Sequence, residues 1–205
     1  MLLSSTDFVV LYHVGCNDGS AAAWCAKMVL GDATIYKAHQ YGWKLPREID
    51  GKHLILVDLS LPMEQIQELL DTKRVRSVMV VDHHKTALPL VDNYAEVRTF
   101  NDYLLALHKG DAGCMQFIKM NRSGAVLAWM FFNNRVEEEF KDNEDLSAQM
   151  PSILSYIEDY DLWHHKLTGT QAVNRWLIDG GLSIERIGKS MDSEGKLLDT
   201  VLHVG

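Results

Sequence analysis

Asp82, His83 and His84 stand in a row directly after the apolar run 78–81. A short apolar run rich in β-branched residues is typical of a buried strand, so the three side chains are expected where that strand gives way to a loop. In an open α/β sheet, ligands bind at the carboxyl ends of the strands. A carboxylate and two imidazoles offer oxygen and nitrogen ligands to a divalent metal ion. The triplet alone is equally compatible with a polar loop in which the acid caps a helix and the histidines are solvated.

Ligand-type side chains also follow two other expected strands. His13 comes directly after the apolar run 8–12, and Asp58 directly after the run 53–57. Asp18 follows His13 within a short stretch that leads into an alanine-rich helix. Three expected strands that each end in an acid or an imidazole are hard to ascribe to turn chemistry alone. The sequence therefore favours a shared polar site at one edge of a sheet.

These strands belong to an alternating series of expected elements. Strands are expected at 8–12, 33–37, 53–57, 75–81 and 95–100. Helices are expected at 20–30, 63–70, 124–132, 145–157 and 171–178. The alternation predicts an α/β fold with a doubly wound, mostly parallel sheet flanked by helices. Residues 101–120 are predicted to be mostly loop, and the tail after 178 to form one or two short amphipathic helices.

Composition restricts the partners and the compartment. The 205 residues include 20 Lys and Arg against 28 Asp and Glu, for a net charge of −8, which argues against binding to long duplex nucleic acid. A short phosphorylated ligand stays compatible with this charge. The 3 cysteines are odd in number and lack a zinc-type spacing, so a reducing compartment is expected, with the cytoplasm as the location. No apolar stretch approaches the length of a membrane span, and no membrane partner is expected.

The tryptophans divide into two expected groups. Trp24, Trp129 and Trp163 are predicted to fill the core rather than to stack on bases. Trp43 lies in the loop after the second strand and is the better candidate for stacking on a base.

Five sequence blocks occur in a fixed order along most of the chain. They are His13-x-x-Cys16-x-Asp18-Gly19, Val57-Asp58-x-Ser60, Val81-Asp82-His83-His84-Lys85-Thr86-Ala87, Ser123-Gly124-Ala125-x-Leu127-Ala128-Trp129 and Ile157-Glu158-Asp159-x-Asp161-Leu162-Trp163. This set resembles the DHH phosphoesterase family, which includes RecJ-like exonucleases, nanoRNA-degrading and cyclic dinucleotide phosphodiesterases, type II pyrophosphatases and exopolyphosphatases.

The resemblance implies two divalent metal ions, usually Mn2+, with Mg2+ or Co2+ as alternatives. The metal ligands it implies are His13, Asp18, Asp58, Asp82, His83 and Asp159, with Asp58 bridging the ions. It also implies that His84 and Lys85 hold the substrate phosphate and form the catalytic set together with Asp82. Ser123 and Gly124 are candidates for binding phosphate through backbone N–H groups, or for simple helix capping.

Two further residues each have two alternative roles. Many family members carry a carboxylate where this chain has Cys16, which is either a ligand that favours a softer metal or a small buried residue. Asp161 is expected to orient other groups or to cap a turn.

The function implied is hydrolysis of a phosphodiester in a short nucleotide, either a di- or oligoribonucleotide or a cyclic nucleotide. The alternatives are a phosphomonoesterase, a pyrophosphatase acting on a small phosphate compound, or an inactive metal-binding regulatory module. Residues 1–165 are expected to form the catalytic domain and 166–205 a helical extension of it. The family's usual C-terminal substrate-binding domain is not expected, because too few residues follow Asp161, and a homodimer is a reasonable expectation.

Overall fold

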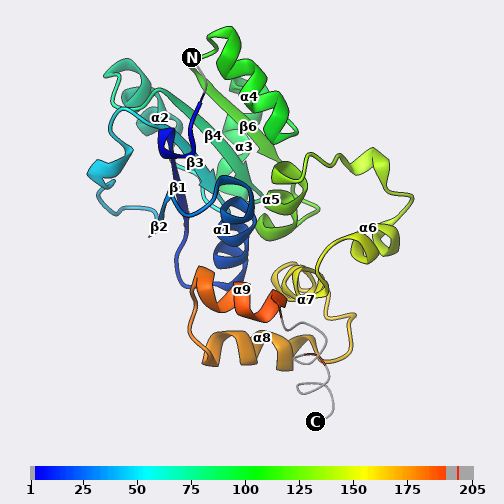
Figure 1. The fold of residues 1–205 in the computed structure, drawn as a ribbon. Helices are drawn as coiled ribbons and strands as arrows, with labels where there is room; N and C mark the ends of the chain where they lie inside the picture. Colours follow the sequence, from blue (N-terminus) through cyan, green and yellow to red (C-terminus); the bar gives the residue numbers. More distant parts are fainter. Residues whose placement is uncertain (1–2, 193–197, 199–205) are drawn as a thin grey trace.

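The structure is a computed structural model that describes residues 3–192 and residue 198 (Figure 1). Within these residues, six parallel strands form one sheet in the order β2-β1-β3-β4-β6-β5. The strands are β1 (Phe8–His13), β2 (Ile35–His39), β3 (His53–Val57), β4 (Ser77–Asp82), β5 (Ala95–Glu96) and β6 (Cys114–Ile118). The helices are α1 (Asn17–Leu30), α2 (Met63–Asp71), α3 (Leu88–Asn93), α4 (Phe100–Lys109), α5 (Gly124–Phe132), α6 (Asn143–Gln149), α7 (Ser152–Asp161), α8 (Thr170–Asp179) and α9 (Ile184–Asp192). The predicted α/β fold class is confirmed.

The central strands are buried on both faces because helices cover both sides of the sheet. Successive side chains of a strand point to opposite faces. On one face, Val10 and Ile55 pack with α1 and α5, while on the other, Val9 and Leu54 pack with α2 and α3. Because the side chains on both faces of the sheet are buried, these strands are continuous apolar runs in the sequence.

The stretch 101–120 is the clearest departure from the sequence prediction. It was expected to be mostly loop, but it holds helix α4 and strand β6. Helix α4 begins after Thr99, whose hydroxyl accepts a hydrogen bond from the Asp102 N–H, and it ends at Gly110 with a φ of 91°. The strand expected at 95–100 is reduced to the two residues of β5 at the sheet edge. The sequence prediction was wrong here because β6 is defined by its pairing with β4 and β5, which local composition does not encode.

The helical pattern that begins at residue 145 is divided into two helices. Met150 adopts an extended conformation with a φ of −116°, and Pro151 precedes the first residue of α7. A proline disfavours helical geometry in the residue before it, so α6 ends there and α7 starts again in a new direction.

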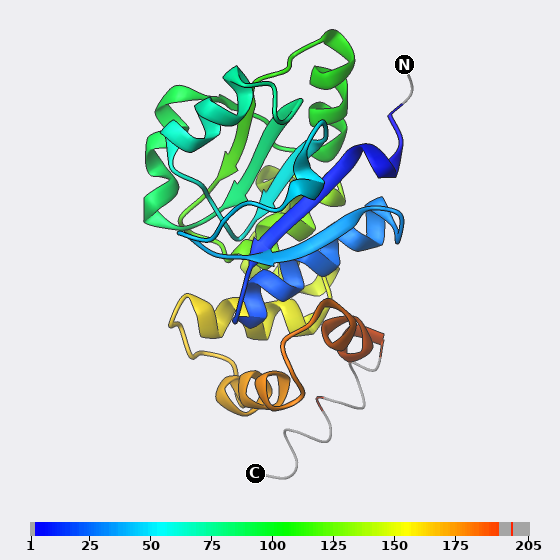
Figure 2. The same ribbon diagram turned by 90° about the vertical axis from the view of Figure 1, so that its left-hand side faces the viewer.

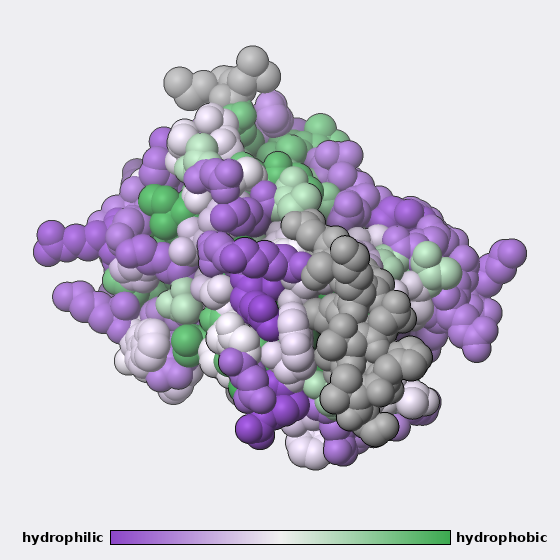
Figure 3. All heavy atoms as spheres, turned by 60° about the horizontal axis from the view of Figure 1, so that its bottom comes forward, coloured by the Kyte–Doolittle hydropathy of each residue, from purple (hydrophilic) through white to green (hydrophobic). Residues whose placement is uncertain are grey.

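The C-terminal helices lie beyond the carboxyl ends of the strands (Figures 1 and 2). Helix α8 packs on α7, and α9 packs on α1. The end of the molecule where these helices lie presents mainly hydrophilic residues with scattered hydrophobic ones (Figure 3). The predicted amphipathic tail is represented by α9, while residues 193–197 and 199–205 lie outside the described part of the chain. Among the helices that the structure describes, none is long and apolar enough to cross a membrane.

Candidate metal centre

Strand register brings the ligand-type residues together at one edge of the sheet. Tyr12 of β1 is paired with Val57 of β3, and Val57 is paired with Val81 of β4. The residues that follow these strand positions, His13, Asp58 and Asp82, are therefore neighbours although about 70 residues separate the first from the last. This arrangement follows from parallel pairing, because the carboxyl ends of adjacent parallel strands lie on the same side.

The Asp58 carboxylate lies between two groups of side chains. Its Oδ2 is 3.6 Å from Nδ1 of His13 and 3.4 Å from Sγ of Cys16. Its Oδ1 is 3.2 Å from Nε2 of His83 and 3.8 Å from Nδ1 of His84. Asp58 has a φ of 52°, a left-handed conformation that aspartate and asparagine tolerate better than most residues. One carboxylate thus faces ligand-type atoms on both sides.

Asp18 and Asp161 complete the group around His83. Nε2 of His83 is 3.4 Å from an oxygen of each carboxylate. The Asp18 oxygens also accept hydrogen bonds from the N–H groups of Gly124 (2.7 Å) and Ala125 (2.9 Å) at the start of α5. The positive end of a helix dipole therefore holds this buried carboxylate in place.

Among the described residues, three groups of side chains could each hold a metal ion. They are His13, Cys16 and Asp58; Asp58, His83 and His84; and Asp18, His83 and Asp161. Asp58 and His83 each belong to two of these groups.

Two glycines permit the close packing that builds the centre. A Cβ atom on Gly19 would lie 2.2 Å from the His13 carbonyl oxygen. A Cβ atom on Gly124 would lie 2.6 Å from Cβ and Oδ1 of Asp58. Both helices, α1 and α5, approach the strand ends this closely only because these positions lack a side chain.

The buried carboxylates and imidazoles of the cluster shift one another's pKa values. Burial, together with the neighbouring Asp58 and Asp161 charges, raises the pKa of Asp18 well above its usual value. Burial lowers the pKa of His83, but the carboxylates of Asp58 and Asp18 outweigh it and raise the pKa to about 9. Burial would raise the pKa of Asp58, but the rings of His13 and His83 hold it well below its usual range. Three carboxylates around one imidazole form an environment that stabilises added positive charge.

Buried atoms without partners indicate where that charge would sit. Oδ1 of Asp58, Oδ2 of Asp82 and Nε2 of His83 are buried and make no hydrogen bond within the described part of the chain. His83 Nε2 and Asp58 Oδ1 are near enough for an ion pair, but they do not meet hydrogen-bond geometry. Burying such oxygen and nitrogen atoms without a hydrogen-bond partner lowers the stability of the fold. A divalent cation that they bind together removes this penalty. The residues therefore fit a metal ion.

We expect the stability of the metal-free protein to fall as the pH rises from 6.5 to about 9. The folded-state pKa of His83 lies above its ordinary value of 6.5, so its contribution is fully present below pH 6.5 and is lost as the pH passes through about 9. The free energy of unfolding, measured by urea titration with chelator present, should show this loss. A saturating concentration of Mn2+ should abolish it, because the bound ion replaces the proton. A flat profile in the metal-free wild type would contradict the prediction. His83→Asn should show a smaller loss than the wild type, because the raised pKa values of His84 and Asp18 still contribute in the same direction.

Asp82 organises the two histidines that follow it. Its Oδ1 accepts hydrogen bonds from the backbone N–H of His83 (2.8 Å) and of His84 (3.3 Å), and from Nδ1 of His84 (2.7 Å). The Asp82 carboxylate raises the pKa of His84. Because Nδ1 of His84 is bonded to Asp82, Nε2 is the ring nitrogen that is available to a ligand. Lys85 follows in an exposed turn.

Asp159 is not brought to the cluster. Its carboxylate accepts hydrogen bonds from the backbone N–H of Lys166 (2.9 Å) and of Leu167 (3.1 Å), and from the Thr170 hydroxyl. These contacts hold the loop after α7, and the residue that faces His83 is Asp161. On a helix, residues two positions apart point in different directions, so only one of the two aspartates can face the strand ends. Asp161, whose expected role was left open between orienting other groups and capping a turn, therefore faces the cluster in place of Asp159.

Asp161→Asn should weaken metal binding by at least about a hundredfold at one site, the upper end of the range for partners that support metal ligands. Asp159→Asn should leave metal affinity nearly unchanged but lower the free energy of unfolding by about 1–3 kcal/mol, because the loop loses acceptors. Calorimetric titration with Mn2+ and urea unfolding of both variants measure the two effects. If Asp159→Asn weakened metal binding and Asp161→Asn left it unchanged, Asp159 would be the ligand instead.

Ser123 and Gly124 have other partners than a phosphate. The Ser123 N–H donates to Glu158 (3.1 Å), and the Ser123 hydroxyl caps α5 by accepting from the Val126 N–H (3.4 Å). The Gly124 N–H donates to Asp18. The start of α5 thus positions a carboxylate of the centre, and these backbone donors are already occupied.

The tryptophan expectations are met only in part. Trp129 is buried, and Trp24 is partly buried against the core. Trp163 was expected in the core but is 79% exposed, beside Tyr160 at a ring-centroid distance of 6.4 Å. Its φ of 56° lies just after the end of α7, where the chain leaves the helix, and the ring is left in solvent.

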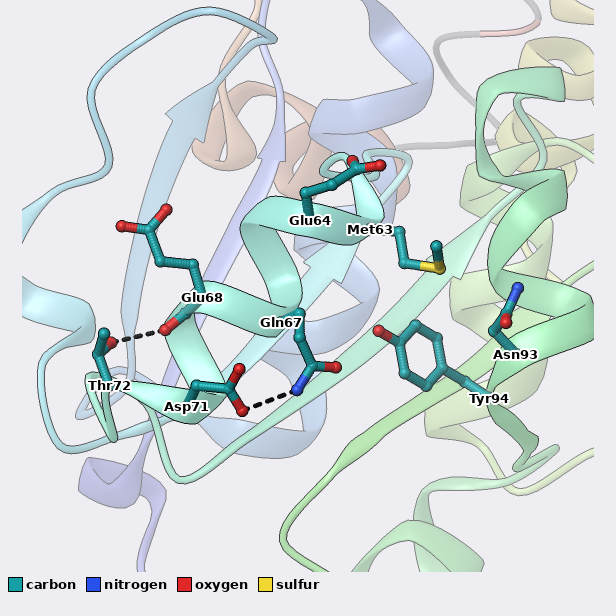
Figure 4. Close-up of a pocket in the computed structure, with 8 residues that line it drawn as sticks. All are labelled: Met63, Glu64, Gln67, Glu68, Asp71, Thr72, Asn93 and Tyr94. Carbon is teal, nitrogen blue, oxygen red and sulfur yellow. Dashed lines mark hydrogen bonds between the residues drawn. The ribbon is translucent and has the colours of Figure 1, made fainter.

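A cleft of about 430 Å3, the Tyr41 cleft, opens onto this centre. It is lined by His13, Tyr41, Asp58, Leu59, Ser60, Leu61, Pro62, His84 and Thr86. A larger hollow of about 720 Å3 lies along α2, where Glu64, Glu68 and Asp71 line it together with Tyr94 (Figure 4). Its carboxylates would repel a phosphate, and it contains none of the residues of the metal centre. The Tyr41 cleft, which is lined by His13, Asp58 and His84, is therefore a site at which a ligand can reach the centre.

These findings define a parallel α/β domain with a buried cluster of histidines and aspartates that could bind metal, an arrangement that suggests catalysis. No model of a known protein family matches this chain, and no curated protein or solved structure does.

Proposed function

We propose that this protein is a metal-dependent phosphoesterase that hydrolyses a phosphodiester in a short nucleotide. The observation that carries this proposal is the position of Asp58, whose two oxygens face different groups of ligand-type atoms. A carboxylate placed in this way can be shared by two metal ions. Two ions bound there would lower the pKa of a water molecule and stabilise negative charge on a phosphoryl group.

Side chains around Asp58 supply the proposed ligands. One ion would be held by Asp18, His83 and Asp161, together with Asp58, whose Oδ1 lies 3.2 Å from Nε2 of His83. This set of oxygen and nitrogen donors suits Mn2+ and also admits Mg2+ or Co2+. The other would be held by His13, Cys16 and Asp58. Cys16 gives this second set a sulfur donor, which favours a softer ion. Burial and the Asp58 charge raise the pKa of Cys16, so an ion must displace its proton to bind there.

His84 is the proposed phosphate-binding and proton-donating residue. It is held by Asp82 and lines the Tyr41 cleft. Because Asp82 raises its pKa, a larger fraction of the His84 ring is protonated near neutral pH. A protonated ring can donate a hydrogen bond to a phosphate oxygen or a proton to the leaving oxygen. Lys85, exposed beside it, would add positive charge at the entrance.

The resemblance to DHH phosphoesterases supports the same reaction. Of the five blocks, four contribute a side chain to the cluster, and the remaining one contributes the start of α5 that holds Asp18. The net charge of −8 favours a short nucleotide over a long polymer. Location in the cytoplasm and assembly into a homodimer stay predictions.

Hydrolysis assays test the proposal directly. Purified protein with Mn2+ should release product from a diribonucleotide and from bis-para-nitrophenyl phosphate, and chelator should stop the reaction. Elemental analysis should find two metal ions per chain. Turnover of para-nitrophenyl phosphate without turnover of the diesters would identify a phosphomonoesterase instead. Bound metal without hydrolysis of any of these substrates, with Mn2+, Mg2+ or Co2+, would contradict the enzyme assignment and favour a regulatory module.

A further inference from the structure

The Tyr41 cleft shares three residues with the metal centre. His13, Asp58 and His84 line the cleft and also belong to the groups that could hold metal ions. A group bound in the cleft is therefore adjacent to a phosphate held at the centre. The volume of about 430 Å3 lies within the range of about 300–1,000 Å3 that is usual for small-molecule sites.

The charge of this lining argues against a second phosphate. Asp58 is its one carboxylate, and among the described residues that line the cleft there is no lysine or arginine. Recognition of phosphate groups relies on such cations, because charge-assisted hydrogen bonds balance the negative oxygens. Apart from His84, which is assigned to the scissile phosphate, a second phosphate would find no such partner among the described residues that line this cleft. Its occupant is expected to be uncharged.

The remaining lining suits a flat, largely apolar ring. Leu59, Leu61 and Pro62 offer aliphatic surface, and Tyr41 is 76% exposed. Within the described structure, the Tyr41 ring contacts no other aromatic ring, so its face is free to stack. The hydroxyls of Ser60 and Thr86 also line the cleft and can bond the polar edge of such a ring. Aromatic faces bind nucleobases by stacking.

We propose that the Tyr41 cleft binds the nucleobase next to the scissile phosphate and that Tyr41 is the ring on which this base stacks. This inference rests on the proposed function and narrows it to base-bearing phosphodiesters. It also moves the stacking role from Trp43, the residue favoured by the sequence. Trp43 lies against His39, with ring centroids 6.1 Å apart, and lines a separate hollow with Lys44 and Arg74.

Variants of the two aromatic residues in this loop test the inference. Tyr41→Ala should raise KM for a diribonucleotide by about tenfold or more, as expected from the loss of one base–aromatic stack, and should change kcat less. Tyr41→Phe should retain the wild-type KM, because the ring is preserved. Trp43→Ala is the matched control and should leave KM unchanged. An abasic dinucleotide should be hydrolysed with a higher KM by the wild type, and Tyr41→Ala should not raise that KM further.

Binding separates this inference from the proposed function. With Mn2+ present, adenosine monophosphate should bind the wild type about tenfold or more tightly than ribose 5-phosphate, and Tyr41→Ala should remove this preference. If no substrate is hydrolysed but the binding preference is present, the phosphoesterase proposal fails and the base site stands. Equal binding of the two monophosphates, or a Tyr41→Ala variant with an unchanged KM and an unchanged preference, would overturn the base site.

Discussion

Asp58→Asn should lower metal-dependent phosphodiester hydrolysis by about a thousandfold or more and should abolish the binding of both metal ions. Asp58 belongs to the group with His13 and Cys16, and its other oxygen lies 3.2 Å from Nε2 of His83, so both proposed metal sites would include it. Metal ions supply several kcal/mol of stabilisation to the transition state, and about 1.4 kcal/mol corresponds to a tenfold change in rate. Loss of the carboxylate that would be shared by the two ions should thus remove most of the catalytic effect at once.

Asparagine is the informative replacement at this position. Asp58 has a φ of 52°, and asparagine tolerates this left-handed conformation, so the backbone can stay as it is. The measurements are elemental analysis, calorimetric titration with Mn2+, and hydrolysis of a diribonucleotide. Asp92→Asn, at an exposed position on α3, is the control and should behave as wild type. Full activity of Asp58→Asn with two bound ions would refute the dinuclear arrangement.

Gly19→Ala should lower the free energy of unfolding and weaken metal binding together. An added Cβ would lie 2.2 Å from the carbonyl oxygen of His13, and because that atom is backbone, it cannot swing aside. The start of α1 must then move away from the end of β1, and Cys16 and Asp18 move with it. Overpacking of this kind lowers the free energy of unfolding by about 1–3 kcal/mol. This loss is opposed by the helix propensity of alanine, which is more favourable than that of glycine by about 1 kcal/mol.

Gly113→Ala is the matched control for this effect. A Cβ atom at Gly113 would have no atom within 4 Å, and this glycine is not among those with a positive φ. Its substitution should leave stability within about 1 kcal/mol of wild type and metal affinity unchanged. Urea unfolding and Mn2+ titration of both variants provide the comparison. If Gly19→Ala matches Gly113→Ala in both measurements, the close approach of α1 to β1 is not required for the centre.

The sequence indicated which strand ends would carry the chemistry because apolar runs and the polar residues after them are local features. The runs that end at Tyr12, Val57 and Val81 were each recognised as strands. Their parallel pairing then requires that His13, Asp58 and Asp82 be neighbours. The exposed glutamates and aspartates along α2 carry no such signal, since they follow the solvated face of a helix.

Side-chain direction was the information that the sequence did not contain. Asp159 and Asp161 are two residues apart in one block, and their chemistry is identical. Only the packing of α7 decides that Asp161 faces His83 while Asp159 holds the loop that contains Lys166 and Leu167. The same limit applies to Trp163, which a left-handed turn directs into solvent, and to Tyr41, whose place beside the centre depends on where its loop lies.

The sequence by itself determined the α/β class, the central strands and the residue types available for a metal centre. Hydrophobic periodicity and the polar residues that follow each strand depend only on residues close together in the chain. The tertiary structure alone decided that Asp58 lies in two of the groups that could hold a metal ion, that the start of α5 holds Asp18 rather than an open phosphate site, and that β6 lies between β4 and β5. These outcomes depend on distances between segments far apart in the chain. Such distances are set by packing and strand register, and no local pattern of residues encodes them.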